Sequence, residues 1–238
     1  MIILGRISPV IYALIFFTFS SFAQQIPLNK YGLRVVESFD TYKQLVEKNS
    51  DKELIDLEKF IPGIVIDIKY ATPDNFTKKV LYPKSKAFVR LPVAKALLKI
   101  QNELKLKGLE LKIFDGYRPY DITVFMWGAT ELKKYVANPR EGSRHNRGCA
   151  VDLTIIDSKT RLELEMPTLY DDFTLKAHHN YKKLSKTAIK NRALLKNLMV
   201  RNGFKIMAAE WWHYDFNGWK NYELMNISFD DLMTIKLN

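Results

Sequence analysis

Residues 143–156 read Ser-Arg-His-Asn-Arg-Gly-Cys-Ala-Val-Asp-Leu-Thr-Ile-Ile, a polar stretch that passes into an apolar, β-branched one. Residues 150–156 have the composition of a core strand, and residues 140–147 have that of a loop. Asp152 interrupts the apolar run. A buried carboxylate without a partner costs several kcal/mol, and a bound cation removes that cost. His145, in the preceding loop, is a side chain that could share such a cation with Asp152.

A second polar cluster is Glu-Trp-Trp-His-Tyr at residues 210–214. His145, Asp152 and His213 together match a catalytic zinc site, which takes three His or carboxylate ligands and leaves its fourth position open. Glu210 would then stand beside the metal as a general base. Residues three apart point to opposite faces of a flat strand. We therefore expect Glu210 in a turn or bulge before the strand that carries His213.

The sequence assigns no catalytic role to the other two histidines or to the cysteine. His178 and His179, the other two of the four histidines, follow Lys176 and are interpreted as part of a solvated loop, with a second metal site as the alternative. Cys149, the single cysteine, has no dedicated base in the sequence and is interpreted as a small buried side chain. An exported chain with one cysteine forms no internal disulfide.

Hydrophobic periodicity predicts a mixed order of strands and helices outside these clusters. Strands are predicted at residues 64–70, 109–113, 150–156, 161–166, 204–206 and 211–216. Helices are predicted at residues 42–47, 93–104, 121–136 and 185–201. Adjacent strands without regular βαβ alternation predict an α+β domain rather than a doubly wound sheet.

The N-terminus has the layout of a secretory signal peptide. A basic start that includes Arg6 precedes an apolar run at residues 10–19 and a small-residue exit at Ala23. We predict cleavage after Ala23 and a mature chain of residues 24–238 that folds as one domain and is exported to the periplasm or beyond. The run is short for a membrane span, so no stable insertion is expected after cleavage, although an uncleaved anchor remains the alternative.

The formal net charge is +11 at pH 7, with 37 Lys and Arg against 26 Asp and Glu. The lysines are scattered rather than gathered in a block. Nucleic-acid binding calls for clustered charge together with base-reading elements, so no nucleic-acid partner is expected.

Five ordered motifs between residues 61 and 216 resemble the D-alanyl-D-alanine dipeptidases of the vancomycin-resistance type. These belong to the zinc DD-peptidase superfamily, which also holds DD-carboxypeptidases and the Hedgehog signalling domain. The motifs are Asp-Ile-Lys-Tyr-Ala-Thr at 67–72 with Asp-Asn-Phe-Thr at 74–77, Asp-Gly-Tyr-Arg-Pro at 115–119, Ser-Arg-His at 143–145 through Asp-Leu-Thr at 152–154, Tyr-Asp at 170–171 with His-His at 178–179, and Glu-Trp-Trp-His-Tyr at 210–214. Any one of them alone would be weak, whereas the ordered set is specific.

The resemblance implies a role for each matching residue. It implies one zinc ion on the face of a small antiparallel sheet flanked by helices, and a small D,D-dipeptide as substrate. The implied zinc ligands are His145, Asp152 and His213, the implied catalytic residues are Glu210 and the transition-state arginine Arg118, and the implied substrate-binding residues are Tyr70, Ser143 and Asp171, with Asp171 facing the substrate amine.

Two departures from the resistance enzymes keep alternatives open. Those enzymes act in the cytoplasm, whereas this chain carries an export signal. The stretch between Arg118 and Ser143 is shorter here, which predicts a wider site that admits longer peptides or other D-amino-acid dipeptides. The alternatives are a DD- or LD-carboxypeptidase or endopeptidase acting on peptidoglycan stem peptides, and a non-catalytic zinc-stabilised binding module. The joint presence of Glu210 and Arg118 argues against the binding module.

Overall fold

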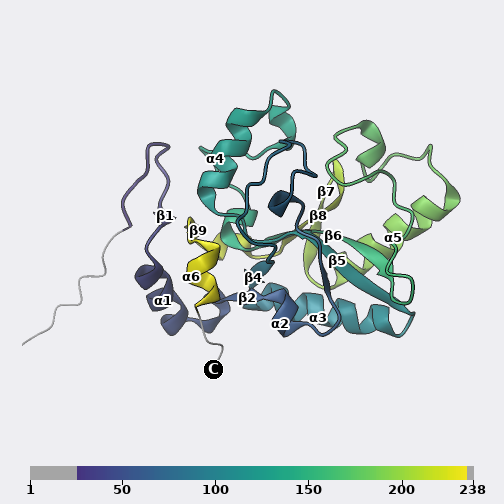
Figure 1. Cartoon of the computed structure of the whole chain (residues 1–238), viewed down its shortest axis with the longest axis horizontal. Helices are drawn as coiled ribbons and strands as arrows, with labels where there is room; N and C mark the ends of the chain where they lie inside the picture. Colours follow the sequence, from purple (N-terminus) through teal and green to yellow (C-terminus); the bar gives the residue numbers. More distant parts are fainter. Residues whose placement is uncertain (1–25, 235–238) are drawn as a thin grey trace, which may run out of the picture.

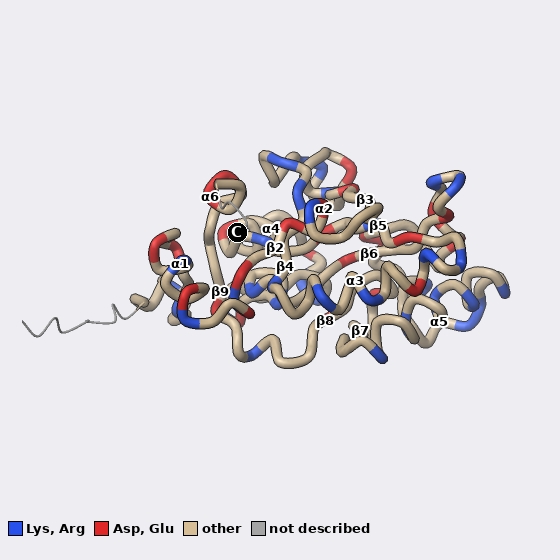
Figure 2. Tube along the Cα trace, turned by 90° about the horizontal axis from the view of Figure 1, so that it is seen from below, with Lys and Arg blue, Asp and Glu red and all other residues tan. Residues whose placement is uncertain are grey.

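A computed structural model of the chain describes residues 26–234 (Figure 1). The predicted signal peptide at residues 1–23 lies outside the described residues, so its cleavage stays a prediction. Within residues 26–234, no helix combines the length and the apolar character needed to cross a membrane. Lysine and arginine are spread along the described trace and interspersed with acidic residues, rather than gathered in one block (Figure 2).

The centre of the molecule is a five-stranded sheet with the strand order β3-β5-β6-β8-β7. Its strands are β3 (Val65–Ile66), β5 (Leu109–Asp115), β6 (Ala150–Asp157), β7 (Phe204–Met207) and β8 (Glu210–Phe216). All neighbours pair antiparallel except the edge pair β3 and β5, which is parallel. The small, mainly antiparallel sheet flanked by helices is the α+β fold that the sequence predicts.

Helix α3 (Leu91–Lys105) packs beside β5 through a face that its sequence pattern predicts. Its apolar side chains recur at helical spacing, and Val93, Leu97, Ile100 and Leu104 are fully buried. Gln101 lies on the same buried face, and its side-chain oxygen accepts a hydrogen bond from the Leu111 N–H at 2.8 Å. The helix is therefore tied to the start of β5 by polar as well as apolar contacts.

Helix α5 (Lys186–Arg201) packs against β7 at the other edge of the sheet (Figure 1). Ser185 caps its N-terminus by accepting a hydrogen bond from the Ala188 N–H at 2.9 Å. From within the helix, the Arg192 guanidinium donates to the carbonyls of His178 and Tyr181 at 2.9 and 2.8 Å. The helix thus fixes the loop that precedes it as well as the sheet edge.

Two small sheets and four shorter helices complete the described chain. Strand β1 (Val35–Val36) pairs parallel with β9 (Leu224–Met225), and β2 (Leu54–Asp56) pairs antiparallel with β4 (Phe88–Arg90). The remaining helices are α1 (Phe39–Lys48), α2 (Leu57–Phe60), α4 (Tyr120–Ala129) and α6 (Phe229–Met233). The 3-10 turns are η1 (Ser50–Lys52), η2 (Lys69–Ala71), η3 (Lys133–Tyr135), η4 (His145–Arg147), η5 (Leu175–Ala177) and η6 (Trp219–Asn221).

The strand predicted at residues 161–166 is wrong. After β6 the chain turns at Asp157 and makes one isolated antiparallel bridge, from Glu163 to Ile156. Arg161 has a φ of 62°, which breaks extended geometry, and Leu162 is 69% exposed. The alternation of apolar and polar residues that suggested a strand here does not correspond to a buried face.

Two other elements are shorter than predicted. The helix predicted at 121–136 ends at Ala129, because Thr130 is extended with φ −137° and ψ 148°, and the chain re-forms only one 3-10 turn at η3. The strand predicted at 64–70 pairs over Val65–Ile66 alone and then enters the 3-10 turn η2. In both places an apolar pattern continues beyond the regular element that it helps to form.

Candidate active site

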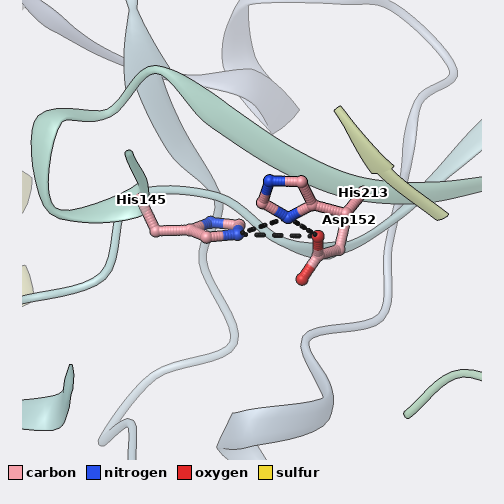
Figure 3. Close-up of side chains that lie close together, drawn as sticks. All are labelled: His145, Asp152 and His213. Atoms are coloured by element: carbon pink, nitrogen blue, oxygen red, sulfur yellow. Dashed lines mark hydrogen bonds and ion pairs between the residues drawn. The ribbon is translucent and has the colours of Figure 1, made fainter. Parts of the chain in front are cut away.

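Three buried side chains converge at one end of the β6–β8 pair (Figure 3). Asp152 on β6 lies directly opposite His213 on β8, so the antiparallel register places both on one face. His145 reaches them from η4. His213 Nδ1 is 2.9 Å from Asp152 Oδ1 and 3.2 Å from His145 Nε2, and His145 Nε2 is 3.5 Å from Asp152 Oδ1.

These separations suit one tetrahedral zinc ion. Ligand atoms about 2.0–2.1 Å from a shared tetrahedral zinc lie roughly 3.3 Å from one another. Each imidazole also has its second nitrogen engaged, as metal-binding histidines usually do. His145 Nδ1–H donates to the Gly116 carbonyl at 2.7 Å, and His213 Nε2–H donates to Asp215 Oδ1 at 2.9 Å. The structure therefore brings the three predicted ligands together, with one nitrogen of each imidazole and Asp152 Oδ1 facing one point.

Asp152 has the partners that the sequence argument required. Burial on its own would raise the pKa of this carboxyl, but the charges and hydrogen bonds of His145 and His213 outweigh burial and hold the pKa well below its usual range. The Tyr170 hydroxyl donates to the other carboxylate oxygen at 2.9 Å. Asp152 is thus held ionised and oriented toward the two histidines.

Glu210 is the first residue of β8, at an irregularity in the β7–β8 ladder. As β7 advances by one residue from Ile206 to Met207, its partner in β8 changes from Tyr214 to Glu210. This is the bulge that the i, i+3 spacing predicts, and it brings Glu210 Oε2 within 4.0 Å of His213 Nδ1. Burial raises the pKa of Glu210 to about 7, with His213 acting in the opposite direction.

Arg118 is placed by the turn that follows β5. Its Nε and one terminal nitrogen donate to Asp115 Oδ2 at 3.1 and 2.6 Å, and its guanidinium lies 5.2 Å from the centre of the Tyr70 ring. Burial would lower the pKa of Arg118, but the Asp115 carboxylate and the surrounding tyrosines together outweigh burial and raise it. The turn requires Gly116, because a Cβ there would lie 2.7 Å from the Phe88 carbonyl oxygen. Asp115 also pairs with Asp152 across the strands, so this anchor belongs to the same end of the sheet.

Asp171 and Tyr70 form a further polar pair. The Tyr70 hydroxyl donates to Asp171 Oδ2 at 3.3 Å. Asp171 has a φ of 58°, a left-handed conformation that is uncommon outside glycine. Burial raises the pKa of Asp171, and the nearby carboxylates of Asp152 and Glu210 raise it further. Among residues 26–234 no basic side chain forms an ion pair with it, so this carboxylate is suited to receive a cation from a ligand.

Ser143 stands at the start of the turn that carries His145. Its backbone N–H donates to Asn146 Oδ1 at 2.7 Å, and its hydroxyl oxygen accepts from the His145 N–H at 3.1 Å. The hydroxyl proton is therefore available to a ligand. One cavity of about 260 Å³ is lined by all eight residues proposed from the sequence, namely Tyr70, Arg118, Ser143, His145, Asp152, Asp171, Glu210 and His213.

The histidines and the cysteine that were set aside do not line this cavity. The backbone N–H of His179 donates to the Ala208 carbonyl at 3.1 Å, beside the β7–β8 turn, and its ring packs 6.1 Å from that of Tyr214. Both His178 and His179 are half-buried rather than solvated as predicted. Cys149 is fully buried, as predicted, and burial raises the pKa of its thiol to about 12.

Sequence reasoning assigned no individual role to three supporting residues. Asp215 and Tyr170 hydrogen-bond to His213 and Asp152, and Asp115 orients Arg118. Asp215 could have been found, because residues two apart share one face of a strand. Tyr170 stands in the Tyr-Asp motif at 170–171 but received no role of its own, since only the loop conformation brings its hydroxyl to Asp152.

Comparisons with known proteins identify the family that the sequence motifs resemble. The family model described as D-ala-D-ala dipeptidase, of the M15 peptidases, matches residues 50–230. The chain is 33% identical to a D-alanyl-D-alanine dipeptidase of Escherichia coli strain K12, covering 74% of this chain and 91% of that protein. It is also 33% identical to a D-alanyl-D-alanine dipeptidase of Enterococcus faecium, covering 66% of this chain and 88% of that protein.

The solved structures that resemble this chain align with only part of it. The LdcB LD-carboxypeptidase aligns with a TM-score of 0.37 at 25% identity, over 56% of this chain and 61% of that one. The sequence matches are the informative ones, since the family model spans every motif of the cavity and the two relatives are each covered over most of their length. The chain belongs to the D-alanyl-D-alanine dipeptidase family of M15 peptidases.

Proposed function

We propose that this protein hydrolyses D-alanyl-D-alanine, or a closely related D,D-dipeptide, to free D-amino acids with one zinc ion as cofactor. The observation that carries the proposal is the single cavity that joins His145, Asp152 and His213 with Glu210 and Arg118. A module that used zinc only for stability would have no need of a buried carboxylate and a buried arginine in the same cavity as the proposed ligands. Its relatives, named D-alanyl-D-alanine dipeptidases, support the choice of substrate.

His145, Asp152 and His213 would hold the zinc through Nε2, Oδ1 and Nδ1. When bound, zinc acidifies a coordinated water and acts as a Lewis acid toward the scissile carbonyl. Asp215 and the Gly116 carbonyl keep the two imidazoles in the tautomers that leave these nitrogens free for the metal.

Glu210 acts as the general base. Its carboxylate is 7% exposed and reaches within 4.0 Å of the ligand atom of His213. From that position Oε2 takes a proton from the attacking water and later delivers it to the leaving amine. Burial raises the pKa of the metal-free Glu210 carboxyl to about 7, and a cation bound nearby would lower it and so favour the ionised form that accepts the proton.

Arg118 stabilises the negative charge that develops on the carbonyl oxygen during attack. Two of its five N–H donors are committed to Asp115, which fixes the guanidinium and leaves the others for the oxyanion. Because the side chain is already oriented, little reorganisation is needed during the reaction. Loss of such a donor typically costs about 2.7–4 kcal/mol of barrier, or roughly 10²–10³ in kcat.

The substrate amine is expected at Asp171, with Tyr70 orienting that carboxylate. An ammonium group placed there relieves the repulsion among Asp171, Asp152 and Glu210 that raises the Asp171 pKa. The cavity volume of about 260 Å³ lies below the roughly 300–1,000 Å³ typical of drug-sized ligands. Both features favour a short peptide with a free amino terminus over a polymer.

The test is hydrolysis of D-Ala-D-Ala beside its N-acetylated form and a stem pentapeptide, with zinc and with chelator. Cleavage of the free dipeptide alone is expected, and chelator should abolish it. Cleavage of the pentapeptide without the dipeptide would point instead to a carboxypeptidase. Glu210→Gln should keep zinc and lose most turnover, by roughly 10²–10⁴, whereas full activity in this variant would refute its role as base.

We also propose that the protein is exported and that its dipeptide comes from cell-wall peptides. The proposal stands on the N-terminal sequence, with its apolar run before Ala23. Cell fractionation together with N-terminal sequencing of the mature protein tests it. A mature chain that begins at Gln24 in the envelope fraction is expected, and an intact cytoplasmic chain that begins at Met1 would contradict it.

A further inference from the structure

A free dipeptide carries a carboxylate as well as an ammonium, and the cavity must accommodate both. The proposed roles account for the ammonium at Asp171 and for the scissile carbonyl at Arg118. They leave the C-terminal carboxylate without a cationic partner. Desolvating a carboxylate without a compensating charge is costly, so a dipeptide-specific cavity needs one more cation.

Three basic side chains line the cavity: Arg118, Lys134 and Arg144. Arg118 is already bound to Asp115 and stacked on Tyr70. Lys134 is exposed, and its ammonium rests 4.7 Å from the ring of its own neighbour Tyr135. An exposed ammonium is screened by solvent and selects weakly.

Arg144 is held in place while its donors remain free. It stands between Ser143 and the ligand His145, and its guanidinium packs 4.8 Å from the centre of the Trp219 ring. Its Nε lies 3.6 Å from Asp215 Oδ2, which is close enough to orient it but too long for a hydrogen bond. Within residues 26–234 no acceptor hydrogen-bonds any of its N–H groups, and the buried Nε is without a partner.

We propose that Arg144 binds the C-terminal carboxylate of the substrate at this cavity, beside the Ser143 hydroxyl. The inference rests on the proposed dipeptidase function and names the residue that makes the site selective for a free C-terminus. A planar guanidinium presents paired donors that match a carboxylate, and stacking on Trp219 reduces the entropy lost when it binds. Asp171 then binds the amino end of the peptide and Arg144 binds its carboxyl end, so the separation of these two residues limits the length of the peptide.

The experiment compares Arg144→Gln with the wild-type protein on D-Ala-D-Ala and on D-alanyl-D-alaninamide, which lacks the carboxylate. Losing a charged hydrogen-bond pair should lower kcat/KM for the free dipeptide about 10- to 100-fold. Hydrolysis of the amide should change by less than about threefold, because the missing interaction is absent there from the start. An equal loss on both substrates, or no loss on the free dipeptide, overturns the proposal.

Two matched variants, Arg147→Gln and Lys134→Gln, and a measurement of zinc content separate the alternatives. Arg147→Gln removes the same charge from the same turn and the same Trp219 ring, at 5.4 Å, but Arg147 does not line the cavity. It should not discriminate between the two substrates, and neither should Lys134→Gln. If Lys134→Gln is the variant that discriminates, the carboxylate site belongs to Lys134. Zinc content should be equal in all variants, since a loss confined to Arg144→Gln would indicate a structural role through Asp215.

Binding to zinc-loaded Glu210→Gln protein keeps this test independent of turnover. Calorimetry should show D-Ala-D-Ala binding about tenfold or more weaker when Arg144→Gln is added, and the amide unaffected. If the wild-type protein hydrolyses neither peptide, the proposed function fails, while this comparison still decides whether Arg144 recognises the carboxylate. Equal weakening of both ligands would refute it.

Discussion

Replacing Asp215 by asparagine should weaken zinc binding without touching a metal ligand. Asp215 Oδ1 accepts the Nε2–H of His213 at 2.9 Å, and its side chain is 15% exposed. Asparagine keeps the shape but removes the charge that polarises the imidazole. A buried charged hydrogen bond is worth about 1.5–3 kcal/mol. Loss of a carboxylate partner behind a metal-binding histidine typically costs 10- to 100-fold in affinity, or about 1.4–2.8 kcal/mol. The two routes agree, so we expect the zinc Kd to rise about 10- to 100-fold.

Competition against a chromophoric zinc chelator at fixed pH measures this Kd. Asp40→Asn is the matched control, because it makes the same chemical change on a surface side chain that is 80% exposed. At saturating zinc and saturating dipeptide, Asp215→Asn should recover most of its kcat, since Glu210 and Arg118 remain in place, whereas loss of the Asp215 contact to Arg144 should raise KM. A Kd within about twofold of wild type would refute the reasoning and would mean that His213 is oriented by packing alone.

Three further predictions concern other parts of the molecule. Burial raises the Cys149 thiol pKa to about 12, so a thiol reagent near pH 8 should label the native protein far more slowly than the urea-unfolded one, and equal rates would contradict that burial. His179 has its pKa lowered to about 4 by burial and by Lys196, so protons bind the unfolded chain first and stability falls as pH drops from 6.5 toward 4. In chelator, His179→Gln should lose up to about 2.5 kcal/mol less than wild type between pH 7 and about pH 4.5 in urea titrations, and parallel losses would count against it. Tyr135 lines the cavity and stacks on Phe173 with centroids 4.7 Å apart, so Tyr135→Ala should shift kcat/KM toward the stem pentapeptide and away from the dipeptide about tenfold, whereas an unchanged ratio would show that this wall does not limit peptide length.

The metal centre could be predicted because its signals are local. An aspartate inside a buried apolar strand is costly, and Asp152 therefore signals a partner in one short window of sequence. The spacing of Glu210 and His213 predicts a bulge, because a flat strand would separate them. The β7–β8 ladder changes register at that point. Such features follow from strand geometry, which needs no knowledge of the remote chain.

The predictions that failed concern segments in which the local sequence pattern suggests one structure and contacts with distant residues determine another. Residues 161–166 alternate like a strand, yet the neighbouring position on the sheet is not used beyond the bridge at Glu163. The helix predicted to reach 136 ends at Ala129, where the chain departs to line the cavity instead. His178 and His179 were interpreted as solvated, but Arg192 of α5 pulls their loop against the sheet edge. Tertiary contacts decided each case.

The contrast between residues fixed by the sheet and residues placed by loops indicates which positions can alter substrate specificity. The proposed zinc ligands depend on the register between β6 and β8 and on the tight turn η4, so a change that shifts them disturbs the core of the sheet. The groups proposed to contact the ends of the peptide stand on loops: Asp171 in a left-handed conformation, and Arg144 stacked on Trp219. Loops tolerate substitution better than packed strands. We therefore expect variants at Arg144 or Tyr135 to change which peptide is cleaved while zinc affinity stays nearly constant, and variants on β6 or β8 to lose zinc affinity and activity together.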